Sequence, residues 1–221
     1  MTRDGGRSRI EWVVLDLGET LVDETGVWSA WADWLRVPRL TYFAEIGAAL
    51  AERRPHTDAI EAFSPGADLG KLVRRKDADG HGWSLTLDDL YPDALPTLDA
   101  LHRAGYSVAV FANQPVSAES LMSALPVDRY ASSARWGVQK PDPAFFARVT
   151  SELDVAPSAI AYVGDRVDND VLPSKAAGMY AVHLVRGPWG RVQSRWPEAS
   201  SADVSIPDLG ALLPALAAAA R

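Results

Sequence analysis

The sequence predicts an α/β fold in which helices cover both faces of a parallel sheet and a small helical unit is inserted after the first strand. Two observations predict this fold. Short apolar runs alternate along the chain with helical patterns, and the runs are nearly unbroken, as in strands that are buried on both faces. Roughly ninety residues separate the first run from the second, whereas one crossover helix needs only a dozen or so.

The strands and helices of the sheet region follow from their apolar patterns. Four apolar runs predict strands at residues 12–15, 108–111, 160–163 and 181–185. Apolar residues recur at helical spacing between them, at residues 94–104, 117–125 and 144–153. Asp142 can cap the last of these helices, with Pro143 as its first residue. Ligands of such sheets bind beyond the carboxyl ends of the strands, so polar residues at those ends are the candidates for a functional site.

The insertion after the first strand has a different character. It contains two helical stretches and then a Gly- and Asp-rich stretch with little pattern, at residues 27–35, 40–53 and 64–89. Tryptophans recur at three-residue spacing, on one side of the first helix, at Trp28, Trp31 and Trp34. They could stack on an aromatic substrate, but large aromatic side chains more often form the core of a small unit. The charged run at residues 74–76 is expected on a solvated face.

Composition limits the classes of partner and of chemistry. The 221 residues are enough for one substantial core and a small accessory unit, and 22 basic against 29 acidic residues give a formal net charge of −7. This charge argues against nucleic acid or an anionic membrane as a partner, and the lack of cysteine excludes thiolate zinc sites and cysteine nucleophiles. Residues 1–9 do not resemble a signal peptide, and the apolar stretch 209–220 is too short to span a bilayer. We therefore expect a cytoplasmic protein of undetermined oligomeric state.

Charged residues stand after the predicted strands and ahead of a predicted helix. Asp16 directly follows the first strand, and Lys140 lies just ahead of a helix. A loop after a later strand carries Asp165 and Asp170, and hard cations such as Mg²⁺ prefer a few carboxylates plus water. Each feature alone has an ordinary structural explanation. These are a turn aspartate, a solvated lysine, and a cap from Asp168 or its neighbour on the next helix.

Taken in order, these features resemble the motif series of one family. Asp16, Asn113 at the end of the second strand, Lys140-Pro141-Asp142-Pro143 and the loop Gly164 to Asp170 resemble the haloacid dehalogenase-like (HAD) superfamily over nearly the whole chain. The resemblance implies a Rossmann-like three-layer core with a parallel sheet, formed by residues 1–22 and 91–221. It also implies a small helical cap domain, residues 23–90, that opens and closes over the site.

The resemblance further implies a Mg²⁺-dependent hydrolase, most simply a phosphatase that acts on a small phosphorylated metabolite. Asp16 would attack phosphorus to give an aspartyl-phosphate, which water then cleaves. Lys140 would neutralise the phosphate and keep the nucleophile ionised. The implied catalytic residues are Asp16 and Lys140, the implied substrate-binding residues are Asn113 and Lys140, and the implied Mg²⁺ ligands are Asp16, the main-chain carbonyl of Gly18, Asp165 and Asp170.

Two positions depart from the family pattern. Gly18 stands where phosphatases of this superfamily usually carry the Asp that acts as general acid and base. Ala112 stands where a Ser or Thr usually bonds a phosphate oxygen. General acid–base catalysis contributes about 10²–10⁴-fold to rate. Without an Asp at position 18, another residue must supply the proton, the leaving group must need none, or the protein is a weak enzyme.

Several alternatives therefore stay open. A carboxylate beyond the first strand, or a histidine in the insertion, could deliver the proton: Glu19, Asp23, Glu24 or His81. The leaving group could need no proton, or the protein could be a weakly active or non-catalytic binder of a phosphate ligand. Halide release also needs no acid, so a dehalogenase is a further candidate. Dehalogenases of the superfamily lack the carboxylate pair that Asp165 and Asp170 provide, which favours phosphate-ester hydrolysis.

Overall fold

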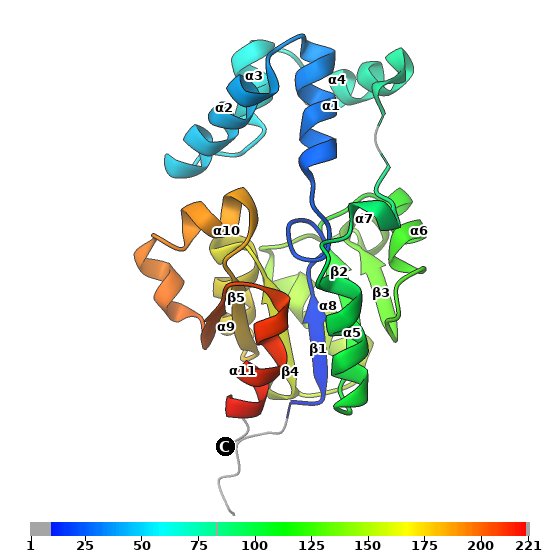
Figure 1. The fold of residues 1–221 in the computed structure, drawn as a ribbon, viewed down its shortest axis with the longest axis vertical. Coiled ribbons are helices and arrows are strands. Elements are labelled where there is room, and N and C mark those ends of the chain that lie inside the picture. The colour runs from blue at the N-terminus through cyan, green and yellow to red at the C-terminus, as the bar shows by residue number, and fades with distance from the viewer. Residues whose placement is uncertain (1–9, 83, 220–221) are drawn as a thin grey trace, which may run out of the picture. The chain divides into compact units, whose positions relative to one another are not determined.

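The computed structural model describes residues 10–82 and 84–219, which divide into two compact units (Figure 1). The first unit contains the described residues up to Val22 and from Leu90 onward, and the second runs from Asp23 to Asp89. In the described part of the chain, no helix combines the length and the apolar character that crossing a membrane requires.

The first unit is built around one sheet, and all of its pairings are parallel, which confirms the predicted α/β fold. Its strands are β1 (Trp12–Leu15), β2 (Ser107–Ala112), β3 (Arg129–Ser132), β4 (Ile160–Gly164), β5 (Tyr180–Leu184) and β6 (Val204–Ile206). They lie in the order β3-β2-β1-β4-β5-β6. Leu15 of β1 pairs with Val110 of β2 and with Val163 of β4. The carboxyl ends of these three strands therefore meet at one edge of the sheet.

Helices cover both faces of this sheet (Figure 1). They are α5 (Ala94–Arg103), α6 (Glu119–Met122), α7 (Ser133–Trp136), α8 (Pro143–Leu153), α9 (Leu172–Ala176), α10 (Gly187–Gln193) and α11 (Leu212–Ala219), with 3₁₀ turns at Val116–Ala118, Pro157–Ala159, Pro197–Ser201 and Leu209–Ala211. Side chains of a strand alternate between the faces. Val14 and Tyr162 share a buried cluster with Phe146 and Val149 of α8, whereas α5 and α11 lie on the opposite face. The first unit therefore has three layers.

The start of α8 forms as its sequence predicts. Asp142 precedes the helix, and its side chain accepts a hydrogen bond of 2.8 Å from the N–H of Ala144. Pro143 is the first helical residue, where its missing N–H costs nothing. This cap fixes the direction in which the chain leaves Lys140 and enters the helix.

Two strands of the sheet have no counterpart in the sequence prediction. β3 reads Arg-Tyr-Ala-Ser and β6 reads Val-Ser-Ile, so neither is an unbroken apolar run. Both lie at the edges of the sheet, where one side of the strand has no partner strand. Edge strands are short and carry polar side chains, which explains why apolar patterning did not identify them.

The second unit is helical. Its elements are α1 (Thr25–Leu35), α2 (Arg39–Ala51), α3 (Asp58–Phe63), α4 (Leu69–Lys76), a π-type turn (Asp77–His81) and a 3₁₀ turn (Leu87–Asp89). α4 lies in the stretch that seemed poorly patterned, and the side chain of Asp68 caps it by accepting from the N–H of Lys71 at 2.7 Å. Trp31 is buried whereas Trp28 and Trp34 are partly exposed. Trp31 therefore contributes to the core of this unit.

Lys76 corrects one expectation for the second unit. The charged run 74–76 was expected on a solvated face, but Lys76 is only 5% exposed. Its Nζ donates to the carbonyl oxygen of His81 at 2.5 Å and lies 5.2 Å from the ring centroid of Trp31. The alkyl chain of a lysine can lie along an apolar surface while its ammonium reaches a polar partner, so one residue of a charged run can be buried.

Candidate functional site

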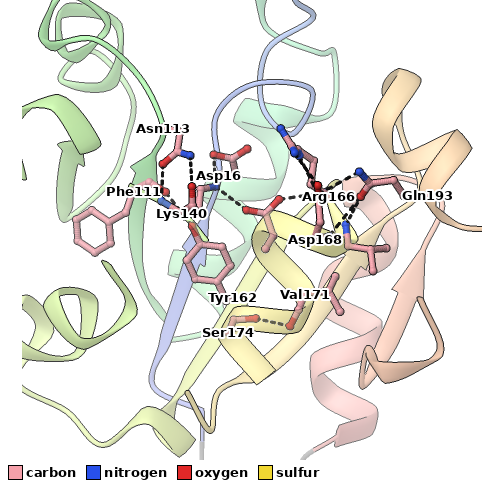
Figure 2. Close-up of polar contacts among 12 residues, drawn as sticks. Asp16, Phe111, Asn113, Lys140, Tyr162, Arg166, Asp168, Val171, Ser174 and Gln193 are labelled. Atoms are coloured by element: carbon pink, nitrogen blue, oxygen red, sulfur yellow. Dashed lines mark hydrogen bonds and ion pairs between the residues drawn. The ribbon is translucent and has the colours of Figure 1, made fainter. Parts of the chain in front are cut away.

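Four charged side chains from distant parts of the chain meet at the carboxyl edge of the sheet. Figure 2 shows two of them, Asp16 and Lys140. The Nζ of Lys140 lies 2.7 Å from Oδ1 of Asp16 and 2.5 Å from Oδ1 of Asp170. Asp16 directly follows β1, and its N–H still donates to the carbonyl of Val163 in β4. As whole residues, Asp16, Lys140, Asp165 and Asp170 are each 9% exposed or less. The structure thus brings together Asp16, Lys140 and the carboxylates Asp165 and Asp170, which the sequence singled out.

Lys140 is held in place by the side chain of Asn113. Oδ1 of Asn113 accepts from the N–H of Lys140 at 2.8 Å, and Nδ2 of Asn113 donates to the carbonyl of Lys140 at 2.8 Å. Asn113 was predicted as a substrate-binding residue, whereas the contacts seen here position Lys140. The ring of Tyr162, whose centroid lies 5.5 Å from Nζ, packs beside the ammonium group and was not singled out from the sequence.

The charges at this site are unbalanced. Burial alone lowers the pKa of Lys140, but the charges of Asp16 and Asp170 outweigh burial and raise that pKa well above its ordinary value. Burial, followed by the charges of Asp170 and Asp16, raises the pKa of Asp165 well above its ordinary value. Three buried carboxylates thus lie close together, and the ammonium group of Lys140 pairs with two of them, Asp16 and Asp170. A further cation would therefore stabilise the site.

The carboxylates are arranged as ligands for a divalent cation. One oxygen each from Asp16, Asp165 and Asp170 lie within 4.8 Å of one another. Oδ2 of Asp165 is buried and has no hydrogen-bond partner among the described residues. A buried carboxylate oxygen without a donor is costly unless a cation or water satisfies it. Mg²⁺ prefers such oxygen ligands together with water, so the donor set fits the expected ion.

Gly164, at the end of β4, allows this arrangement. A Cβ built on Gly164 would lie 2.3 Å from the carboxyl group of Asp170. Only a glycine therefore lets the Asp170 side chain fold back against the strand end. His183 in β5 is fully buried, and its Nε2 lies 3.1 Å from the carbonyl oxygen of Asp165, so this histidine supports the strand end that carries Asp165.

The turn that carries Gly18 is closed by main-chain hydrogen bonds. The N–H of Val22 donates to the carbonyl of Leu17 at 3.0 Å, and the N–H of Glu19 donates to the carbonyl of Val22 at 2.8 Å. Glu19 has a positive φ of 52° and is 4% exposed. Its Oε2 accepts from the hydroxyl of Tyr91 at 2.7 Å. Of the four residues named as possible proton donors, Glu19 alone belongs to the same unit as Asp16; Asp23, Glu24 and His81 belong to the other.

The loop after β4 differs from the local prediction. A cap from Asp168 or its neighbour on the next helix was the ordinary structural explanation of this loop. Residues Val167–Val171 instead form a π-type turn that receives no side-chain cap from the residue before it. Gln193, at the end of α10, accepts from the N–H of Val167 at 2.6 Å instead. No local signal in the sequence identifies Gln193, because it lies 26 positions further along the chain.

Comparisons with known proteins agree with this geometry. The chain is 33% identical over 110 residues to a glyceraldehyde 3-phosphate phosphatase of Methanopyrus kandleri, and the match covers 48% of this chain and 47% of that protein. It is 30% identical over 192 residues to phosphoglycolate phosphatase 1 of Pseudomonas aeruginosa, which covers 79% of this chain and 69% of the relative. The chain thus spans about half of the first relative's length and about two thirds of the second's.

A solved structure shares the fold. The crystal structure of a predicted phosphoglycolate phosphatase from Haemophilus somnus 129pt aligns with a TM-score of 0.68 and 22% identity, covering 95% of this chain and 99% of that one. The family model of the haloacid dehalogenase-like hydrolases matches residues 10–178, a segment that contains Asp16, Asn113, Lys140, Asp165 and Asp170. Because this match covers well over half of the sequence and all of the residues that meet at the sheet edge, the chain belongs to the haloacid dehalogenase-like hydrolase family.

Proposed function

We propose that this chain is a Mg²⁺-dependent phosphatase that hydrolyses a small phosphorylated metabolite through an aspartyl-phosphate. The observation that carries the proposal is the meeting of Asp16 with Lys140, Asp165 and Asp170 at one edge of the sheet. The names of the relatives, a glyceraldehyde 3-phosphate phosphatase and a phosphoglycolate phosphatase, support a phosphorylated acid or aldehyde of two or three carbons as the substrate class.

The side chains at the site suit phosphoryl transfer. Asp16 is the nucleophile, and its attack breaks the bond between phosphorus and the leaving oxygen. Bound Mg²⁺ would offset the charge of the carboxylates and of the phosphate, and Asp16, the carbonyl of Gly18, Asp165 and Asp170 are its proposed ligands. Lys140 donates a hydrogen bond to Asp16 and would neutralise a phosphate oxygen, and Asn113 fixes Lys140 through its main chain.

The proton for the leaving group is the weak point of this chemistry. Gly18 provides no side chain that could act as an acid, and Ala112 provides no hydroxyl for a phosphate oxygen. Glu19 is the candidate within the same unit, but its carboxylate already accepts a hydrogen bond from Tyr91. These departures favour, as a second candidate function, a weakly active or non-catalytic binder of a phosphate ligand. A dehalogenase ranks lower, because the three clustered carboxylates suit a cation.

The second unit, residues 23–89, is proposed as the cap that selects the substrate. It is compact and helical, and the chain enters and leaves it next to the turn that carries Gly18. Caps of this kind exclude water from the reacting groups. Its polar hollow of about 560 Å³ is lined by Trp34, Arg36 and Arg75 among others, but nothing in it identifies a ligand.

A substrate screen tests the proposed function. Wild type and Asp16→Asn are assayed with Mg²⁺ against phosphate monoesters, including phosphoglycolate and glyceraldehyde 3-phosphate, and against acyl phosphates, with EDTA controls. We expect wild type to release phosphate from at least one substrate, and Asp16→Asn and the EDTA samples to release none above background. If wild type releases phosphate from no member of the panel, the enzyme proposal is wrong and the binder proposal takes its place.

A further inference from the structure

The turn Val167–Val171, which follows Asp165 and contains Asp170, receives no side-chain cap from the residue before it. The first N–H groups of a helical turn have no partner inside the turn and need an acceptor from elsewhere. Oε1 of Gln193 supplies it, at 2.6 Å from the N–H of Val167 and 3.4 Å from the N–H of Asp168. Gln193 is 1% exposed and Val167 is fully buried, so neither group can rely on solvent.

The other end of the Gln193 amide begins a chain of contacts that runs through Asp168 and Arg166 (Figure 2) and leads back to Asp170. Nε2 of Gln193 donates to Oδ1 of Asp168 at 3.0 Å. Asp168 accepts two hydrogen bonds from the guanidinium of Arg166, at 3.0 and 2.8 Å. The main-chain N–H of Arg166 donates to Oδ2 of Asp170 at 3.0 Å. Gln193 thus contacts the turn at two points, the N–H of Val167 and the side chain of Asp168, which in turn binds Arg166.

Only an amide fits both ends of this contact. Its oxygen faces an N–H group, and its NH₂ faces a carboxylate. A glutamate at position 193 would still accept from Val167 but would face Asp168 with a second negative charge. A leucine there would leave the buried N–H of Val167 without an acceptor, which is unfavourable. Of these three side chains, only glutamine therefore offers an acceptor to Val167 and a donor to Asp168.

We propose that Gln193 is a positioning residue for the metal site: it fixes the turn that spaces Asp165 from Asp170 and so sets the affinity for Mg²⁺. The proposal rests on the proposed Mg²⁺ site. Partners that orient the ligands of a metal without touching it typically change metal affinity by about 10–100-fold when they are lost. A Gln193 that merely fastens α10 to the core would change stability and leave Mg²⁺ affinity unaltered.

Mg²⁺ binding without substrate separates these two roles. Calorimetry with MgCl₂ is run on wild type, Gln193→Leu, Gln193→Glu and the double variant Gln193→Glu/Asp168→Asn. The matched control is Arg191→Ala, an exposed position on the same helix. We expect Gln193→Leu and Gln193→Glu to bind Mg²⁺ about 10-fold more weakly or worse. The double variant exchanges the carboxylate and the amide across the same contact but leaves Arg166 with one acceptor fewer, so it should bind Mg²⁺ more tightly than Gln193→Glu and more weakly than wild type.

Hydrogen exchange gives an independent readout on the metal-free protein. The N–H of Val167 should lose protection in Gln193→Leu and keep it in Gln193→Glu, because glutamate still offers an oxygen to that N–H. Thermal melts without Mg²⁺ show which variants are folded. If Gln193→Leu does not fold, the Mg²⁺ affinities of Gln193→Glu and the double variant are compared with that of wild type.

The outcomes distinguish this inference from the proposed function. Equal Mg²⁺ affinity in wild type and in the folded single variants would overturn the role of Gln193, while phosphate release by wild type would leave the proposed function standing. A double variant that binds as weakly as Gln193→Glu would also overturn it, because the complementarity of the two side chains would then be irrelevant. If wild type itself does not bind Mg²⁺, both proposals are wrong.

Discussion

At the scale of single residues, the site concentrates negative charge around one buried ammonium group. Asp16 and Asp170 both contact Lys140, and Asp165 lies close enough for its pKa to be raised by both carboxylates. Such a cluster is costly in a protein unless cations offset it. The excess of negative charge at this site therefore favours the binding of a cation, and a bound cation would in turn favour an anionic substrate.

Replacing Lys140 tests its two roles. Lys140→Met should lower kcat by about 10²–10³, because it removes the group proposed to neutralise the transferring phosphate. Without Mg²⁺ it should also lower the free energy of unfolding by about 3–5 kcal/mol, because Asp16 and Asp170 lose their buried partner. Turnover assays and urea unfolding in EDTA measure both effects.

A matched control separates burial from charge. Lys175 forms an ion pair with Asp203 at 2.5 Å, but its side chain is 44% exposed. Lys175→Met should therefore change stability by less than about 1 kcal/mol and leave turnover unaltered. Equal effects of the two substitutions would show that the buried position of Lys140 has no special importance.

The carboxylates make stability depend on pH. Burial raises the pKa of Asp170 to about 6, despite the opposing charge of Lys140. Between about pH 4 and pH 6 the folded state thus keeps a proton that the unfolded state has released. The free energy of unfolding of the metal-free protein should therefore fall, relative to Asp170→Asn, as the pH rises through this window. Mg²⁺ competes with that proton, so the affinity of wild type for Mg²⁺ should rise over the same window.

Urea unfolding in EDTA at several pH values, with calorimetry at the same values, measures both trends. The difference between wild type and Asp170→Asn is the informative quantity, because other carboxylates titrate in both proteins. A difference that stays constant from pH 4 to pH 7 would contradict the raised pKa of Asp170.

At the scale of secondary-structure elements, the ends of strands decide where the site lies. β1, β2 and β4 end side by side, and the residues that follow them point beyond the same edge of the sheet. β4 ends in Gly164, whose lack of a side chain leaves room for the carboxyl group of Asp170. The glycine at the end of β4 thus helps to determine the position of the Asp170 carboxylate in the site.

Gly164→Ala tests this close approach. The added methyl group would lie 2.3 Å from the carboxyl group of Asp170. Overpacking of this kind typically costs about 1–3 kcal/mol, and here it should also displace a proposed metal ligand. We expect a lower melting temperature and weaker Mg²⁺ binding by calorimetry.

Gly47→Ala is the matched control for this substitution. Gly47 lies within α2, and a Cβ built on it would meet nothing within 4 Å. Alanine favours a helix over glycine by about 1 kcal/mol, so this variant should be as stable as wild type or more stable, with unaltered Mg²⁺ affinity. If Gly164→Ala also keeps the stability and the Mg²⁺ affinity of wild type, the Asp170 side chain can move away from the added methyl group without cost.

At the scale of the whole molecule, ligand binding should stabilise the folded chain. Beryllium fluoride with Mg²⁺ mimics a phosphoryl group on an ionised aspartate, and a ligand at a hundredfold excess over its Kd stabilises the folded state by about 2.7 kcal/mol. We expect thermal unfolding of wild type to shift upward with both additions together. Asp16→Asn should not respond, because an amide cannot coordinate beryllium in this way. Equal stabilisation of both proteins would contradict the assignment of Asp16 as the nucleophile.

Much of the fold could be predicted because its signals are local. β1, β2, β4 and β5 are apolar enough to be read as buried strands without knowledge of their partners. The cap of α8 by Asp142 depends on two adjacent residues. β3 and β6 are strands because neighbouring strands pair with them. Pairing of this kind leaves little trace in a short, polar edge segment.

The candidate site likewise has residues that the sequence predicts and contacts that only the structure shows. Asp16, Lys140, Asp165 and Asp170 could be named from the sequence, because each follows a strand or precedes a helix within a few residues and their order resembles one family. Only the tertiary structure shows that Asn113 holds Lys140, that Lys76 is buried, and that Gln193 supports the turn beside Asp165. These are contacts between distant residues, and a hydrogen bond depends on the position of two atoms in space rather than on the spacing of two residues in the chain.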